Sequence, residues 1–195
     1  SGLLQCGLSE IVSVHFTQSI ITTSGLHFFA NGLILSERIT SLDISNSSCG
    51  DDGIEHLARM IDTSFSLRAL NLKGNGIGPV GMGVLAKILS KQPCVRGDRK
   101  NMRICGLELL KLTRNSAMDA GATQLAHALE SNRSLTILDL TTNGITLEGS
   151  RQLAASLYRN FTLRVLTVVA NTRNQAEKNE IIAMRRAPWK EKETS

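Results

Sequence analysis

The feature of this sequence that most constrains its fold is an internal repeat. The segment from Leu67 to Ile77, followed by Gly81, Leu85 and Leu89, gives a pattern that recurs six times in the 195 residues. Its first apolar position falls at residues 11, 39, 67, 107, 135 and 163, so four of the five intervals are 28 residues and one is 40. A fixed period of this length is typical of proteins in which each repeat is one structural unit that stacks on the next. We therefore expect a single repeat domain that spans residues 1–195.

Composition agrees with this expectation. Apolar residues make up 42% of the chain but aromatic residues only 4%. A core of leucine, isoleucine and valine with few rings fits many small, similar layers better than one large globular interior.

Each repeat predicts a short strand followed by a helix. Leu138 and Leu140 alternate with other residues, which is the period-two pattern of a strand with one buried face. A polar residue follows three positions after the last strand leucine, and we expect its side chain to bond backbone groups of the turn. A glycine then opens the helical half, for close packing or for an unusual backbone angle. The polar residues are Ser19, Ser47, Asn75, Asn115, Asn143 and Asn171, and the glycines are Gly25, Gly53, Gly81, Gly121 and Gly149.

With leucines, asparagine and glycine in this order at a period of 28, residues 11 to about 172 resemble the ribonuclease-inhibitor-like class of leucine-rich repeats. This class includes ribonuclease inhibitor, the sensor domains of NOD-like receptors, the GTPase activator of Ran and the tropomodulins. The resemblance implies an α/β fold, a right-handed solenoid or horseshoe with a parallel concave sheet and convex helices. It implies little about function, because one fold serves many functions.

The two ends of the array depart from the pattern. The last unit has Arg173 and Glu177 where others have isoleucine and glycine, so we expect a capping unit with a helix at about 175–186. Residues 1–10 are too few for a preceding helical layer. We infer either upstream sequence, so that the chain is part of a larger protein, or a partner chain that covers this edge.

The 40-residue interval contains 12 extra residues at about 92–103, between the third helix and the fourth strand. This insertion contains Arg96, Arg99, Lys100 and Arg103 but one acidic residue, Asp98. We interpret it as a basic loop on one rim. Its charge would attract an acidic protein surface or phosphates, and a solvated, mobile loop is the competing interpretation.

Three columns of side chains are expected to project from the concave sheet. They are Ser13, Ser41, Ala69, Leu109, Ile137 and Val165; His15, Asp43, Asn71, Lys111, Asp139 and Thr167; and Thr17, Ser45, Lys73, Thr113, Thr141 and Val169. The first column changes from small or polar to large and apolar at the fourth repeat. We expect an exposed apolar strip of Leu109, Ile137, Val165 and Val169 there, and contiguous exposed apolar surface commonly marks an interaction site.

The residues predicted to bind a partner are therefore Leu109, Lys111, Ile137, Asp139, Val165, Val169, Asn71 and Lys73. Two structural explanations stay open: β-branched residues suit strands in any case, and a neighbouring segment of the chain could cover the strip. The predicted function is a non-catalytic scaffold that binds an unidentified protein on the concave face and rim loops.

Catalytic and cofactor chemistry is not predicted. The sequence has no Ser/His/Asp grouping, paired carboxylates, glycine-rich phosphate loop or metal-ligand spacing. We therefore expect no enzyme, no cofactor, no metal and no small-molecule substrate. The family includes a Ran GTPase activator, which works through a loop arginine, but the corresponding loops here, residues 17–24 and 45–52, contain no arginine. Tropomodulin-like binding to actin in the cytoskeleton is the other alternative, because five full repeats and a terminal helix resemble that domain.

Charge and cysteine usage suggest a setting for the protein. Twenty-two basic against 17 acidic residues give a net charge of +5, which mildly favours acidic partners but falls short of a nucleic-acid-binding composition. No apolar run approaches the length of a membrane span. The four cysteines show no CxxC spacing and no signal peptide is visible, so we expect reduced thiols in a cytoplasmic protein. Cys49 takes the turn position of Ile77 and Ile145, which predicts a small core residue.

Overall fold

The computed structural model describes residues 11–19, 22–34, 38–92, 94–96 and 103–169. Six parallel strands form one sheet in the order β1-β2-β3-β6-β7-β8, and a helix follows each of the first five of these strands. The strands are β1 (Ser13–His15), β2 (Ser41–Asp43), β3 (Ala69–Asn71), β6 (Leu109–Lys111), β7 (Ile137–Asp139) and β8 (Val165–Thr167). The helices are α1 (Thr23–Ile34), α2 (Gly50–Thr63), α3 (Pro79–Leu89), α4 (Met118–Ser131) and α5 (Leu147–Ser156).

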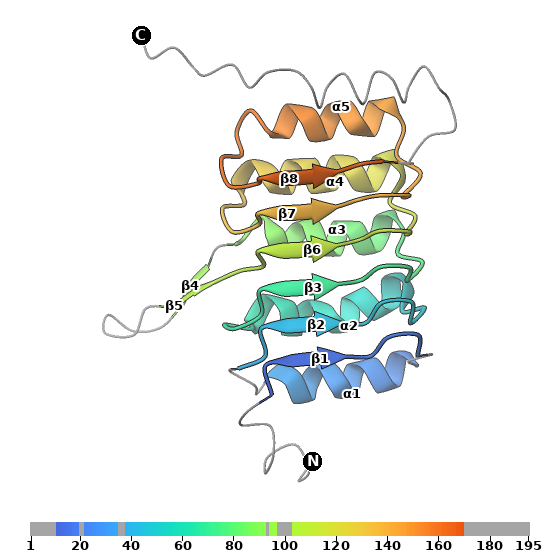
Figure 1. Cartoon of the computed structure of the whole chain (residues 1–195), viewed down its shortest axis with the longest axis vertical. Coiled ribbons are helices and arrows are strands. Elements are labelled where there is room, and N and C mark those ends of the chain that lie inside the picture. The colour runs from blue at the N-terminus through green and yellow to red at the C-terminus, as the bar shows by residue number, and fades with distance from the viewer. Residues whose placement is uncertain (1–10, 20–21, 35–37, 93, 97–102, 170–195) are drawn as a thin grey trace.

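The strands lie side by side in one layer, and the helices form a second layer behind them (Figure 1). Equivalent residues of successive repeats are paired in register, so that Leu70 lies between Leu42 and Leu110. This arrangement confirms the predicted α/β solenoid. The face of the sheet that the helices leave uncovered, called the open sheet face below, is the predicted concave side.

The core lies between the two layers. The central leucine of each inner strand points toward the helices, and Leu42, Leu70, Leu110 and Leu138 are all buried. Since side chains alternate along a strand, the residues on either side of each central leucine point to the open sheet face. Each helix then contributes its own apolar side, such as Leu125 and Leu129 of α4, to the same core.

The asparagines after the strands connect neighbouring repeats. The Asn115 side chain accepts hydrogen bonds from the backbone N–H groups of Asn75 and Ile77, both at 3.0 Å. It donates to the carbonyl oxygens of Leu72 at 3.0 Å and Leu112 at 2.9 Å. The predicted role in the turn is therefore confirmed, but three of the four bonds reach the preceding repeat.

The glycines that open the helical half are explained by close packing. Neither Gly81 nor Gly149 has a positive φ. A Cβ atom at these positions would lie 2.6 Å from Asp51 Oδ1 and 2.5 Å from Asp119 Oδ1, respectively, which is too close for real atoms. At these two positions a carboxylate of the preceding repeat occupies the space, whereas Gly53 and Gly121 lie against Cys49 and Met82 instead.

The first repeat is less well covered than the others. Ile11, at the first apolar position, is 38% exposed, whereas the equivalent Ile39 is 4% exposed. Within the described residues β1 pairs only with β2, and Val12, Phe16 and Phe28 are exposed nearby. The exposure of Ile11 agrees with the expected uncovered edge of the first repeat, since no layer of the described structure packs on its outer side.

The insertion differs from the predicted loop. Its two ends pair as an antiparallel ribbon of β4 (Cys94–Arg96) and β5 (Arg103–Cys105), with Arg96 opposite Arg103. The ribbon projects from the side of the sheet at which the strands begin (Figure 1). Gln92, predicted as the first inserted residue, is buried, and its Oε1 accepts a hydrogen bond of 3.0 Å from the Leu107 N–H. The insertion therefore begins after Gln92. The capping helix predicted at 175–186 lies outside the described residues.

None of the helices in the described ranges combines the length and the apolar character that crossing a membrane requires.

Candidate functional site

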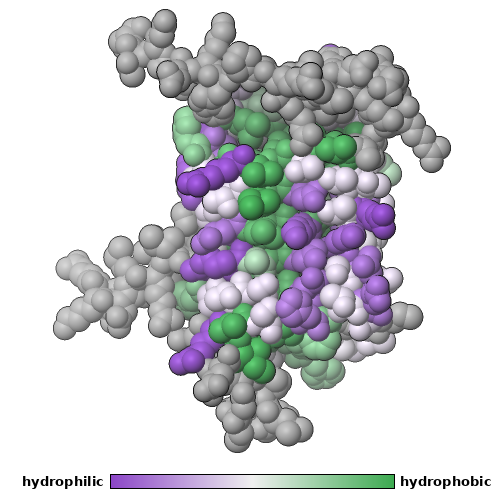
Figure 2. All heavy atoms as spheres, viewed as in Figure 1, coloured by the Kyte–Doolittle hydropathy of each residue, from purple (hydrophilic) through white to green (hydrophobic). Residues whose placement is uncertain are grey.

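The open sheet face carries the predicted columns of side chains. The register of the strands places Leu109, Ile137 and Val165 side by side, and Lys111 beside Asp139. Figure 2 shows a continuous apolar surface over β6, β7 and β8 with polar surface on both sides. The first column is thus apolar over repeats four to six, as its sequence indicates.

The apolar strip consists of Leu109, Ile137, Val165 and Val169, as predicted above. The exposed fraction of the side chain differs among these residues. Val165 is 45% exposed and Val169 is 47% exposed. Leu109 and Ile137 are half-buried, because neighbouring strands flank them on both sides. The strip is therefore most accessible toward the sixth repeat.

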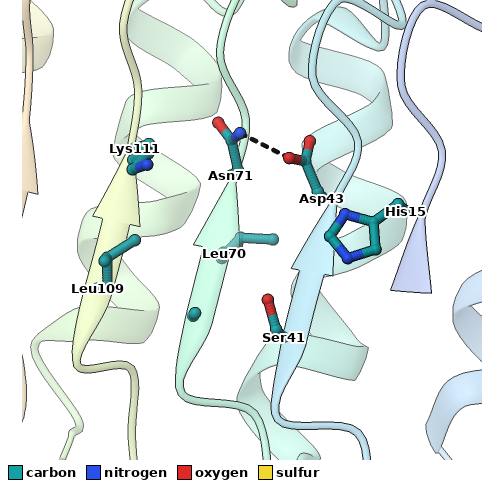
Figure 3. A pocket seen from close by; sticks show the side chains of 8 residues that line it. His15, Ser41, Asp43, Leu70, Asn71, Leu109 and Lys111 are labelled. Atoms are coloured by element: carbon teal, nitrogen blue, oxygen red, sulfur yellow. Dashed lines mark hydrogen bonds between the residues drawn. The ribbon is translucent and has the colours of Figure 1, made fainter. Parts of the chain in front are cut away.

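The neighbouring part of the open sheet face is a hollow over repeats one to four that is lined by both polar and apolar residues (Figure 3). Its lining residues are His15, Ser41, Asp43, Ala69, Leu70, Asn71, Leu109 and Lys111. The two oxygens of the Asp43 carboxylate accept hydrogen bonds from the Ser45 N–H at 2.9 Å and from Asn71 Nδ2 at 2.8 Å. His15 forms a hydrogen bond of 2.7 Å through Nε2 with Ser13 Oγ.

These contacts determine the charge of Asp43. Partial burial by itself would raise the pKa of this carboxyl group. Hydrogen bonds from the Ser45 backbone and side chain and from Asn71, together with the charge of His15, outweigh burial and lower the pKa below its ordinary value. Asp43 is therefore a stable anion at neutral pH.

Asp139 on β7 is held in the same way. Its Oδ1 accepts a hydrogen bond of 2.9 Å from the Thr141 N–H, and its Oδ2 accepts one of 2.9 Å from Thr113 Oγ1. The Asn71 side chain likewise accepts from the Lys73 N–H at 3.2 Å. Second-column residues therefore stabilise the turn after their own strand, which is a structural role that the column pattern did not indicate.

The basic residues in and after β3 and β6 are not paired with these carboxylates in the part of the chain that the structure describes. Lys73, Lys111 and Arg114 form no ion pair within the described part of the chain; the pairs present there are Arg68–Glu108, Lys91–Asp62 and Arg159–Glu130. Lys111 and Arg114 are exposed and Lys73 is half-buried. Arg114 is not among the partner-binding residues predicted from the sequence. Its position in the turn after β6, beside two columns already considered, is the signal that would have found it.

The predicted basic residues of the insertion are only partly placed. Arg96 and Arg103 are opposite one another in the ribbon. Arg99 and Lys100 lie outside the described residues. The ribbon leaves the molecule where β6 begins, whereas Arg114 follows the end of β6, so the two groups of basic residues lie at opposite ends of that strand.

Metal-binding and nucleophilic side chains do not form a further site in the described part of the chain. Among the described residues, no cluster of three or more histidine, cysteine, aspartate or glutamate side chains has the geometry of a metal site. Burial raises the pKa of the Cys49 thiol to about 11, which keeps it protonated and unreactive. Its predicted place in the core is confirmed.

Comparison with known proteins identifies the repeats. A family model described as "Leucine Rich repeat" matches residues 63–86 and 131–154, which contain β3 with the first part of α3 and β7 with most of α5. Both matched segments are therefore strand-helix units of the observed array. The chain is a leucine-rich repeat protein. A comparison of this leucine-rich repeat protein with curated sequences finds no significant match.

Solved structures show similar folds. The tropomodulin C-terminal domain of Caenorhabditis elegans is 17% identical, with a TM-score of 0.63, over 82% of this chain and 90% of that domain. A structure described as leiomodin-1 actin-binding site 2 is 16% identical, with a TM-score of 0.46, over 89% of this chain and 78% of that one. At these identities the likeness to tropomodulin concerns the fold of the leucine-rich repeat protein.

Proposed function

We propose that this leucine-rich repeat protein is a non-catalytic scaffold that binds a protein partner on its open sheet face. We assign it to the ribonuclease-inhibitor-like class on its 28-residue strand-helix repeat, and to the cytoplasm on its cysteine usage. The observation that carries the proposal is the apolar strip, which exposes large side chains on β6 to β8 where a solvated sheet face would be polar.

The apolar strip is large enough to matter for affinity. Fully burying an exposed valine, leucine or isoleucine side chain stabilises a complex by about 2 kcal/mol. The four side chains of the strip are each half-exposed or less, so covering them contributes at most about 4 kcal/mol in total. This corresponds to about a thousand-fold in the dissociation constant.

A matched pair of variants tests the proposal. The strip variant carries Leu109→Ser, Ile137→Ser, Val165→Ser and Val169→Ser. The control variant removes four exposed apolar side chains associated with the helical layer, through Phe28→Ser, Val80→Ser, Met118→Ser and Tyr158→Ser. Both variants should fold, because none of these side chains is fully buried.

The readout is capture of partner proteins from a lysate, quantified by mass spectrometry against the parent protein. We expect the control variant to retain a partner that the strip variant loses. If both variants retain every protein captured by the parent, the open sheet face is not the binding surface and the proposal is wrong.

Actin binding is a second candidate function. The sequence resemblance to the tropomodulins implies it, and the fold similarity to a tropomodulin domain over 82% of this chain supports this alternative. Cosedimentation of the protein with filamentous actin, and protection of filament ends from depolymerisation, test it directly. If the protein neither sediments with filaments nor slows their depolymerisation, actin is not its partner. No observation in the structure favours the GTPase-activator alternative.

A further inference from the structure

A cluster of basic side chains lies at one end of the apolar strip. It consists of Lys73, Lys111 and Arg114, called the basic cluster below. The N–H groups of Leu72 and Gly74 donate to the carbonyl oxygens of Lys111 at 2.8 Å and Thr113 at 2.9 Å. These two bonds flank Lys73 and hold it beside the end of β6. The cluster therefore spans repeats three and four, where the apolar strip begins at Leu109.

The nearby carboxylates Asp43 and Asp139 offset only part of the charge of the basic cluster, because its three cations outnumber these two anions. Asp43 and Asp139 each accept one backbone and one side-chain hydrogen bond from other groups of the sheet. Neither carboxylate forms an ion pair with Lys73 or Lys111 among the described contacts. The carboxylates are short and held at the sheet, whereas lysine and arginine side chains are long enough to reach a bound partner. The charge available to a partner at this end of the strip is therefore positive.

The spacing of the strip limits the shape of the partner. Neighbouring strands lie about 4.8 Å apart, and one turn of an α-helix rises about 5.4 Å. A helix that crosses the strands can thus place one apolar side chain per turn against Leu109, Ile137 and Val165, with a mismatch of about 1 Å over three turns. An extended peptide repeats its side chains on one face every 7 Å or so, and it loses this correspondence after one strand.

We propose that the open sheet face binds an amphipathic helix of a partner protein, with apolar side chains from three successive turns on the apolar strip. Acidic side chains at the end of this helix over repeats three and four bind the basic cluster. This inference rests on the proposed function and adds the chemistry and the conformation of the partner. Helices in apolar grooves are a common mode of peptide recognition, and flanking charges set their orientation.

Selection from a displayed library tests the inference without knowledge of the partner. The probe is a library of randomised 16-residue peptides displayed on phage and selected for binding to the whole parent protein. Peptides that also bind the strip variant are removed, so that the remaining peptides depend on the apolar strip. We expect the surviving sequences to share apolar residues at spacings of three and four and acidic residues grouped toward one end. Surviving sequences that are neutral, basic or alternate in a strand pattern would overturn the inference.

Two charge variants make the test quantitative with the selected peptides. The cluster variant carries Lys73→Glu, Lys111→Glu and Arg114→Glu, and its control carries Arg59→Glu, Lys87→Glu and Arg133→Glu, which are exposed basic residues away from the basic cluster. By calorimetry we expect the cluster variant to bind about a hundred-fold more weakly and the control to bind within about three-fold of the parent. Binding should also weaken as salt is raised, because exposed charges are screened.

The outcomes separate this inference from the proposed function. If the selected peptides need the apolar strip but bind the cluster variant as tightly as the parent, the charge assignment is wrong and the scaffold proposal stands. If the selection yields no strip-dependent peptide, the helix inference is wrong, while the capture experiment decides the scaffold proposal separately.

Discussion

At the scale of single residues, the repeat is defined by side chains that serve a neighbouring repeat. The sequence predicted an asparagine in the turn and a glycine at the start of the helix, because both types recur at a fixed position. It did not predict that Asn115 bonds the backbone on both sides of the junction, or that Gly81 makes room for Asp51. These contacts join residues that are about one repeat apart in the sequence. The pattern within a single repeat contains only one of the two partners and therefore does not predict the contact.

Replacing Asn115 with alanine should therefore be costly. It removes four hydrogen bonds and leaves buried backbone groups of two repeats without partners. We expect the free energy of unfolding to fall by about 3 kcal/mol. Asn31→Ala, at an exposed site on α1, is the matched control and should change stability by less than about 0.5 kcal/mol. Urea denaturation of both variants measures the difference, and equal effects would contradict the bridging role.

The buried thiol of Cys49 predicts a pH dependence of stability. Burial raises its pKa from 9.0 to about 11 in the folded protein, so the protonated thiol contributes stability in full below pH 9.0. This contribution is lost as pH rises through the folded pKa, because the unfolded thiol ionises first. The difference in unfolding free energy between the parent and Cys49→Ala should shrink by about 2 kcal/mol between about pH 8 and 10.5. A constant difference would show that the thiol is not shielded.

At the scale of elements, helices are capped by carboxylates of the preceding repeat. Asp119 of α4 accepts hydrogen bonds from the Thr146 and Gly149 N–H groups at 2.8 and 3.1 Å, at the start of α5. Asp51 of α2 accepts one of 2.6 Å from the Gly78 N–H before α3. Negative charge there also interacts favourably with the helix dipole. The starts of α3 and α5 are thus each fixed by a carboxylate of the helix before it.

Asp119→Ala should destabilise the protein by about 1 kcal/mol, the usual effect of losing a cap. Asp52→Ala is the matched control, since this exposed residue also lies in the first turn of a helix. The caps are best compared by hydrogen exchange of the α5 amides, which should accelerate in the Asp119 variant and remain unchanged in the control. Equal exchange in both variants would argue against a cap from the preceding repeat.

The insertion is an addition to an intact repeat. Gln92 bonds the Leu107 N–H through its side-chain oxygen, and Asn132 bonds the Leu135 N–H in the same way at 2.8 Å. The sequence predicted the 12 extra residues from the spacing. It did not predict their exact start, because a glutamine side chain here replaces an asparagine that the pattern contains elsewhere.

Deleting residues 93–104 together with Gln92→Asn should therefore leave a folded protein. The deletion restores a 28-residue interval and places the amide three positions before Leu107, as Asn132 precedes Leu135. We expect cooperative unfolding with a midpoint close to that of the parent. Deleting residues 93–102 instead leaves two residues too many and should be less stable. If the 12-residue deletion unfolds the array, the ribbon is part of the core structure rather than an addition.

At the scale of the whole molecule, the fold was predictable because leucine spacing repeats and each layer packs on the next. The candidate site was predictable in part. The register of the first column followed from the repeat, and so did its change from Ala69 to Leu109. The repeat pattern did not predict that Leu109 is half-buried or that Asp139 accepts a hydrogen bond from Thr113. Both features depend on side chains of adjacent strands. That Lys111 forms no ion pair with any described residue likewise follows only from the contacts around it.

In the proposed complex, a protein partner covers the open sheet face over repeats four to six. Hydroxyl-radical footprinting of the partner complex, read residue by residue by mass spectrometry, measures this most directly. We expect oxidation of Ile137 and Val165 to fall several-fold on binding, while oxidation of Phe28 and Tyr158, which are associated with the helical layer, stays unchanged. Protection of Phe28 and Tyr158, with Ile137 and Val165 still oxidised as in the free protein, would contradict it.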